Sequence, residues 1–281
     1  MTLLRDVAQV EAVRSRPHSL LEAPRLCADG SAVYSDAIAG GLWECSPQGS
    51  VRELLAKRRG IGGAVAHAHG GWVISGRSLL HVLANGDQRE IFSSEEVCGF
   101  NDLGSTPEGA LLAGALRYRP LAGEPEQPGQ LLQINPDGSV EVLSTEVVWP
   151  NGIGVSPDGQ TIYVSDYARG LVLALARDGR ETREFCSSPS GSTDGLALDA
   201  NGGVWVALGE GGGVARFHAD GTLDEIAELP AGFVSSLCFG GADMRDVLLS
   251  TADNPIDPDL GGTLLTARSV HPGLPVTAVA V

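Results

Sequence analysis

The sequence has no apolar run as long as the roughly 18–20 residues that a membrane-spanning helix needs. Charge appears early, with Arg5 and Asp6, so the N-terminal segment lacks the apolar core of a signal peptide. We therefore expect a cytoplasmic protein that has no membrane partner.

Basic residues are also scarce. The chain has 19 Lys and Arg against 35 Asp and Glu, a net charge of −16. A surface that binds nucleic acid needs clustered basic side chains. The one basic run, Lys57–Arg59, is typical of a short solvated loop, so nucleic acid is not an expected partner.

Several familiar functional motifs are missing. There is no G-x-S-x-G elbow for a serine hydrolase and no G-x-x-x-x-G-K-[ST] loop for nucleotide phosphates. The five cysteines are odd in number and include no C-x-x-C pair. We interpret them as small apolar side chains in a reducing compartment.

Turn-forming residues are abundant, with 38 Gly and 16 Pro in 281 residues. They punctuate a recurring unit, in which a glycine turn precedes two short β-rich runs and a second Asp-Gly or Asn-Gly turn. The glycines that open successive units are Gly30, Gly71, Gly109, Gly159 and Gly203. Their spacings of 41, 38, 50 and 44 residues match the length of a four-stranded propeller blade.

A sixth, less regular unit begins at Asp246, so the units account for nearly the whole chain. The sequence predicts an all-β fold, a six-bladed β-propeller with four-stranded blades, as a single domain over residues 1–281. Because an open ring would expose strand edges, we expect Val7–Val13 to close it as the outer strand of the last blade. The irregular stretch Arg117–Gly129 is either a loop over one mouth of the ring or a plain surface insertion.

Polar residues recur just before the expected innermost strands, which crowd around the central channel. Glu22, Asn151 and Asp194 hold equivalent places in three units. Two carboxylates and an amide oxygen suit a hard divalent cation. The set contains no His or Cys, which argues against a closed structural zinc site.

These segments also carry a resemblance to a known family. The matching segments are Pro150–Gly159 with Ile162–Asp166, Thr193–Gly195 with Asn201–Ala207, Phe100–Asp102 in part, and Cys238–Gly241, Gly261–Leu264 and Pro272–Pro275 near the end. Because of these matching segments, the sequence resembles the SMP-30/gluconolactonase/LRE family of six-bladed propellers, also called the regucalcin family.

The resemblance implies a metal-dependent lactonase that opens sugar-acid or related lactones. It implies that Glu22, Asn151 and Asp194 bind one divalent ion (Ca, Mn, Zn or Fe(II)) and that Asn101 faces the substrate. Such an ion would polarise the lactone carbonyl and activate a bound water. Asp194 would serve as both ligand and general base.

Two positions depart from the family pattern. The usual Glu-Gly-Pro is Glu22-Ala23-Pro24, and an Arg expected two residues before Asn101 is Gly99. The second change predicts a less hydroxylated lactone or a bulkier ester as substrate. Alternatively, Arg117 or the nearby Arg119 supplies the missing guanidinium group and binds the substrate.

Other interpretations remain open at this stage. The first alternative is a hydrolase of carboxylic or phosphoric esters. The second is a non-catalytic propeller that binds a metal or ligand. In each case we expect a monomer or a weak homo-oligomer. Asp102 is expected to be a structural hydrogen-bond acceptor, with a metal ligand as the alternative. His67 and His69 share one strand face and form either a metal pair or ordinary strand and turn histidines. His18 either lines the mouth near Glu22 or plays no part in the site.

Overall fold

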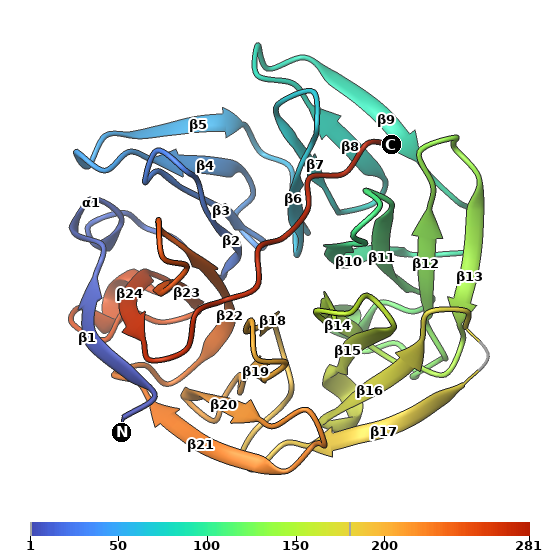
Figure 1. Cartoon of the computed structure of the whole chain (residues 1–281). Coiled ribbons are helices and arrows are strands. Elements are labelled where there is room, and N and C mark those ends of the chain that lie inside the picture. The colour runs from blue at the N-terminus through green and yellow to red at the C-terminus, as the bar shows by residue number, and fades with distance from the viewer. Residues whose placement is uncertain (1, 180) are drawn as a thin grey trace.

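The computed structural model of the protein describes residues 2–179 and 181–281. Six four-stranded antiparallel sheets stand around a central axis, so the predicted six-bladed propeller is confirmed (Figure 1). Each sheet begins with its innermost strand and proceeds outward by hairpins, except that the outermost strand of the sixth sheet comes from the N-terminal segment. Tight turns join the strands, and Gly159 in one of them has the positive φ of 72° that favours glycine.

The first three blades contain these strands: β2 (Leu21–Leu26), β3 (Ala32–Asp36), β4 (Leu42–Cys45) and β5 (Val51–Leu55); β6 (Ala64–Ala66), β7 (Trp72–Ile74), β8 (Leu79–Val82) and β9 (Gln88–Phe92); and β10 (Gly99–Ser105), β11 (Leu111–Leu116), β12 (Gln130–Ile134) and β13 (Val140–Ser144).

The next two blades contain β14 (Pro150–Val155), β15 (Thr161–Asp166), β16 (Leu171–Ala176) and β17 (Thr182–Ser187); and β18 (Leu196–Leu198), β19 (Val204–Ala207), β20 (Gly213–Phe217) and β21 (Leu223–Glu228). The sixth blade contains β22 (Val234–Gly240), β23 (Asp246–Thr251), β24 (Leu264–Ser269) and β1 (Leu4–Gln9). In the described part of the chain, four short helices lie between strands: α1 (Glu11–Arg14), η1 (Pro120–Ala122), η2 (Tyr167–Arg169) and η3 (Pro258–Leu260).

The N-terminal segment closes the ring, as predicted, because β1 pairs antiparallel with β24. The strand spans Leu4–Gln9, so the expected range Val7–Val13 was placed too late. The reason is that Val13 is fully buried and belongs to the short helix α1, which turns the chain away from the sheet.

Apolar side chains pack between neighbouring blades. The buried residues form six hydrophobic clusters, and each joins the facing sheets of two adjacent blades. Tyr34 and Trp205 are among the largest fully buried side chains. This packing fixes the positions of the innermost strands around the channel.

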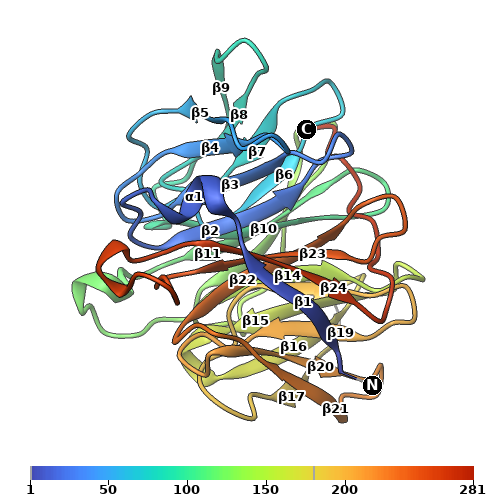
Figure 2. The ribbon, with the colours of Figure 1, turned by 90° about the vertical axis from the view of Figure 1, so that its left-hand side faces the viewer.

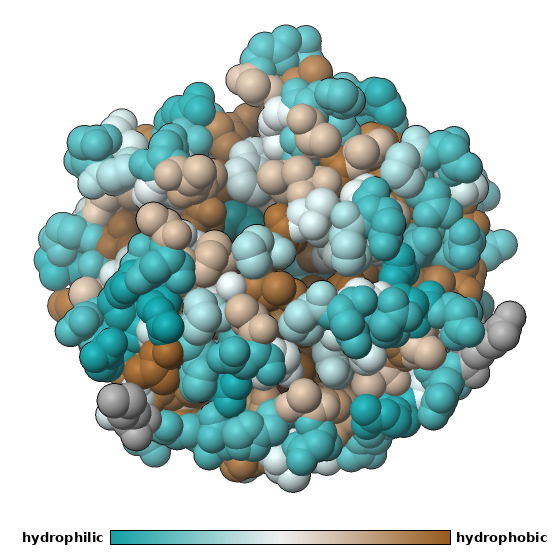
Figure 3. Space-filling view, in the orientation of Figure 1, coloured by the Kyte–Doolittle hydropathy of each residue, from teal (hydrophilic) through white to brown (hydrophobic). Residues whose placement is uncertain are grey.

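The two mouths of the ring differ. The last residues cross the mouth where the innermost strands end: the Leu274 N–H donates to the Leu198 carbonyl (2.8 Å), and the Val279 N–H donates to the Ala66 carbonyl (2.9 Å). Figure 1 shows this red segment passing over the channel, and Figure 3 shows the same face with a largely hydrophilic rim. In Figure 2 the loop after β11 projects from the opposite side of the ring.

Candidate active site

Irregular backbone on the innermost strands shapes the mouth opposite the C-terminal segment. The pairing register shifts between Glu22 and Arg25 on β2, and between Pro150 and Ile153 on β14. β10 has the same shift between Phe100 and Leu103. Such bulges redirect side chains and are frequent beside active sites.

The bulge after Glu22 carries a strained residue. Ala23 has a φ of 52°, in the left-handed region that favours glycine. Ala23 therefore replaces the glycine of the family's Glu-Gly-Pro at a position whose backbone conformation glycine adopts at lower energy. Backbone strain of this kind costs about 1–3 kcal/mol and clusters at functional sites.

The structure brings the predicted polar residues together in one cavity. Glu22, Asn101, Asn151 and Asp194 all line it, at the start of four different innermost strands. Glu22 and Asp194 are nearly inaccessible to solvent, with exposed fractions of 8% and 2%.

Backbone contacts hold these residues in place. The Gly152 N–H donates to the Asp194 carbonyl (3.1 Å), and the Gly195 N–H donates to the Ser235 carbonyl (2.8 Å). These two bonds tie the fourth, fifth and sixth blades together directly beside the candidate ligands. A Cβ on Gly152 would lie 2.1 Å from the Leu196 nitrogen, so only glycine permits this approach.

Both buried carboxylates have a raised pKa. For Glu22, the pKa rises through burial and then through the negative charges of Asp194 and Asp102. For Asp194, burial is again the largest cause, followed by the charges of Asp102 and Glu210, while a hydrogen bond with Asn151 opposes the rise. Like charges packed in a low-dielectric site favour either protonation or a bound cation.

The donor chemistry fits a divalent cation. Within the described part of the chain, the buried Asp194 Oδ1 has no hydrogen-bond partner. An unsatisfied carboxylate oxygen at this depth is costly unless an ion or water completes it. The described residues contain no cluster of three or more His, Cys, Asp or Glu side chains suited to a metal, so a third protein ligand would have to be of another type, such as the Asn151 amide oxygen.

The predicted substrate-binding residues lie in two places. Asn101 lines the cavity, and its Nδ2 donates to the Pro150 carbonyl (3.0 Å). Gly62 leaves room for the Asn101 Oδ1, since a Cβ there would be 2.3 Å away. Arg117 is exposed and is not one of the cavity-lining residues, whereas Arg119 is.

The cavity has a volume of about 680 Å³. The expected long loop reaches it, because Tyr118, Pro120 and Leu121 lie in its wall. The other apolar lining residues come from distant segments: Leu20, Ala37, Ile38, Phe100, Leu116, Trp149, Tyr167, Phe233 and Ala252.

Asp102 acts as the hydrogen-bond acceptor that was expected. Its Oδ1 accepts from the Leu103 N–H (2.6 Å), and it is buried. Burial raises the pKa of Asp102 to about 6, although the nearby Arg25 opposes the rise. Its charge acts on both Glu22 and Asp194, so it belongs to the electrostatics of the site.

The histidines lie apart from this cavity. The His67 Nε2 bonds the Val281 carbonyl (3.0 Å), and its ring stacks on His81 at 3.9 Å, beneath the C-terminal segment. The His69 N–H donates to the His67 Nδ1 (3.1 Å). His18 is buried 3.5 Å from Asp36 and edge-on to Tyr34, and it does not line the cavity.

All five cysteines are free thiols. Among the described residues, no helix has both the length and the apolar character required to cross a membrane.

Comparison with known proteins adds relatives with named activities. The chain is 29% identical to 6-deoxy-6-sulfogluconolactonase from Pseudomonas putida, covering 94% of this chain and 96% of that protein. It is 28% identical to pentonolactonase XacC from Haloferax volcanii, covering 81% and 79%. Its fold matches the crystal structure of a calcium-binding regucalcin from Agrobacterium tumefaciens with a TM-score of 0.82, at 22% identity and 97% coverage of both chains.

The family model described as "SMP-30/Gluconolactonase/LRE-like region" matches residues 20–253, which include every innermost strand from β2 to β22. Together with the six blades and the shared mouth, this match shows that the chain belongs to the SMP-30/gluconolactonase/LRE-like family.

Proposed function

We propose that this protein is a metal-dependent lactonase that hydrolyses a small-molecule lactone. The observation that carries the proposal is the pair of buried carboxylates, Glu22 and Asp194, at the floor of a large cavity with one carboxylate oxygen unpartnered. The sulfogluconolactonase and pentonolactonase relatives support lactone ring opening as the reaction.

Glu22, Asn151 and Asp194 would hold one divalent cation. A bound cation supplies Lewis-acid polarisation of the ester carbonyl and a more acidic water. Oxygen ligands suit Ca²⁺ and Mn²⁺ in particular, and Zn²⁺ or Fe(II) remain candidates for the same site. The calcium-binding regucalcin with the same fold supports a divalent ion here.

Asp194 is the proposed general base. Its Oδ1 has no hydrogen-bond partner among the described residues, so this carboxylate is free for both roles, binding the cation and accepting a proton from the attacking water. The Gly152 N–H on its backbone carbonyl and the Asn151 side chain fix its orientation. The Asn101 amide, held by the Pro150 carbonyl, lies at the same floor and would position the lactone.

The first experiment measures the metal. Purified protein is treated with chelator, dialysed, reloaded with Ca, Mn, Zn or Fe(II), and analysed for metal content and lactone hydrolysis. We expect about one ion per chain and activity only after reloading. Asp194→Ala should lose the ion, because it removes a charged ligand.

A matched control is Glu210→Gln. Glu210 is exposed, accepts a hydrogen bond from Ser192, and affects Asp194 only through its charge. This variant should keep the ion and most of its turnover. Equal metal content in wild type and Asp194→Ala would overturn the ligand assignment. Hydrolysis of aryl esters or phosphotriesters in preference to all lactones would favour the ester-hydrolase alternative, and metal binding without hydrolysis would favour a binding protein.

A further inference from the structure

The cavity has a polar floor and an apolar wall. Above the floor, Trp149 packs on Tyr167 with ring centroids 4.7 Å apart and meets Tyr118 edge-on at 6.5 Å. The hydroxyl of Tyr167 is already engaged with Ser192. Phe233 from the sixth blade extends the wall. An apolar substituent on a substrate would replace water along this surface.

Two aliphatic side chains at the rim are exposed to solvent. Ile38, from the turn after β3, is 50% exposed, and Leu121, from η1, is 85% exposed. Single exposed aliphatic residues need no explanation. These two, however, line the same cavity from different blades, and they continue its apolar wall outward.

The arginines near the cavity are occupied by protein groups. Arg77 donates to the Ser94 carbonyl (3.0 Å), and Arg119 pairs with Glu124 (3.2 Å). Arg58, behind Gly76, donates to the backbone carbonyls of the segment that forms this wall. These guanidinium groups therefore already have partners within the protein.

The backbone also keeps the position of Gly99 small. Gly76 and Phe100 exchange two backbone hydrogen bonds, of 2.7 and 3.2 Å, across the junction of the second and third blades. A Cβ at Gly99 would lie 3.1 Å from the Gly76 carbonyl oxygen, which is tighter than ordinary van der Waals contact. The close approach of the two blades therefore favours glycine here, and Gly99 itself contributes no polar side chain to the cavity.

From these observations we propose that the substrate is a lactone bearing a hydrocarbon substituent. The ring lies over Glu22, Asn151 and Asp194, and the substituent runs along Trp149 and out between Ile38 and Leu121. This inference rests on the proposed lactonase function and specifies its substrate class. A volume of about 680 Å³ lies within the roughly 300–1,000 Å³ typical of pockets for drug-sized ligands.

The test compares kcat/KM for three lactones with six-membered rings: gluconolactone, δ-valerolactone and δ-decalactone. We expect δ-decalactone, which carries a pentyl chain, to exceed δ-valerolactone by tenfold or more. Complete burial of one methylene is worth about a fourfold change, so partial burial of five gives at least this gain. Gluconolactone should be the poorest of the three.

Rim variants separate the chain contacts from the chemistry. Leu121→Ser and Ile38→Ser change exposed residues outside the catalytic floor and should fold normally. Each should reduce the rate on δ-decalactone severalfold more than the rate on δ-valerolactone. Val142→Ser is the matched control, because Val142 is 54% exposed on β13 and does not line the cavity.

The outcomes are distinguishable. Hydrolysis of gluconolactone at least tenfold better than δ-decalactone would overturn the substrate class while leaving the lactonase proposal intact. Loss of that preference in Arg119→Ala would show that the loop arginine binds hydroxyl groups after all. Equal rates on δ-valerolactone and δ-decalactone would also overturn the inference. Failure to open any lactone with any metal would overturn the lactonase proposal together with it.

Discussion

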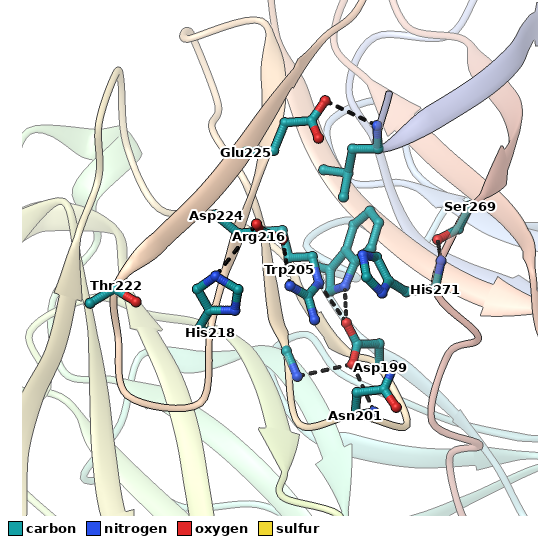
Figure 4. Close-up of polar contacts among 12 residues, drawn as sticks. Asp199, Asn201, Trp205, Arg216, His218, Thr222, Asp224, Glu225, Ser269 and His271 are labelled. Atoms are coloured by element: carbon teal, nitrogen blue, oxygen red, sulfur yellow. Dashed lines mark hydrogen bonds and ion pairs between the residues drawn. The ribbon is translucent and has the colours of Figure 1, made fainter. Parts of the chain in front are cut away.

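Asp194 and Asp199 are buried carboxylates that lie just before and just after the same inner strand, β18, but their hydrogen-bond partners and neighbouring charges differ. Asp199 accepts four hydrogen bonds: from the Asn201 and Gly203 N–H groups, the Trp205 indole and the Arg216 guanidinium (Figure 4). Asp194 has a carboxylate oxygen without a partner among the described residues, and acidic neighbours instead of a basic one.

The pKa values follow this difference. Burial alone would raise the pKa of Asp199, but the bonds from Arg216 and Trp205 outweigh it and lower the pKa. At Asp194 nothing outweighs burial and repulsion, so its pKa is raised. A buried carboxylate whose hydrogen bonds and ion pairs are all made within the protein stabilises the fold. A buried carboxylate that lacks such partners is a candidate for binding an ion or substrate. The following predictions test that distinction.

The largest expected effect is on catalysis. Asp194→Asn keeps an oxygen ligand but removes the basic carboxylate, so kcat should fall by about 10²–10⁴. The free energy of unfolding of the metal-free variant should be unchanged or higher, because a repelled buried charge has been removed. Steady-state kinetics and urea unfolding check both statements. A near-normal kcat would show that Asp194 is not the base.

The second prediction concerns Asp199. Asp199→Ala should lower the free energy of unfolding by about 3–5 kcal/mol, because it breaks a buried ion pair and leaves the Trp205 indole and two N–H groups unpaired. Turnover per folded molecule should be retained, since Asp199 lies at the other mouth.

Asp224→Ala is the control for this variant. Asp224 also pairs with Arg216 (2.6 Å) but is 30% exposed, so its loss should cost less. If Asp199→Ala unfolds no more easily than Asp224→Ala, the assignment of a structural role to the buried pair is wrong.

The third prediction is a pH dependence of opposite sign for two buried acids, Asp102 on β10 and Asp199 after β18. In metal-free protein, the raised pKa of Asp102, about 6, means that the folded state binds its proton more tightly than the unfolded chain. Its stabilising contribution is fully present below pH ~3.8 and is lost as the pH rises through about 6, a change of at most about 3 kcal/mol. Asp199 behaves in the opposite way: its contribution is present above pH ~3.8 and is lost as the pH falls through its lowered pKa.

Urea unfolding with chelator present, between pH 4 and 7, measures this effect. Wild type should become more stable toward pH 4, and Asp102→Asn should flatten the profile. A divalent ion should remove the trend, because it stabilises the charged carboxylates. An unchanged slope in Asp102→Asn would contradict the assignment.

The ring itself was predictable because its signals are local. Each Asp-Gly or Asn-Gly turn and each alternating run specifies a hairpin without help from distant residues. The end of β1 was misplaced because the burial of Val13 depends on its packing within the cluster between the first and sixth blades. The alternation of Val7–Val13 alone does not reveal that packing.

Part of the candidate site could also be inferred in advance. Glu22, Asn151 and Asp194 recur at the same point of a repeated unit, so symmetry alone brings them to one mouth. The aromatic wall has no such repeat. Trp149 precedes β14 and Tyr167 follows β15 in the fourth blade, whereas Phe233 precedes β22 of the sixth, so the whole wall forms only when the ring closes.

The sequence by itself therefore determined the number of blades, the closing strand and the polar residues that reach the channel, because each depends on a pattern within one repeat. The tertiary structure decided which buried carboxylate has hydrogen-bond partners, which arginines are paired with protein groups, and which walls of the cavity are apolar. These properties arise from contacts between blades. There, burial and nearby like or opposite charges change the free energy of the charged form of a side chain. The position of that side chain in the sequence does not reveal these contacts.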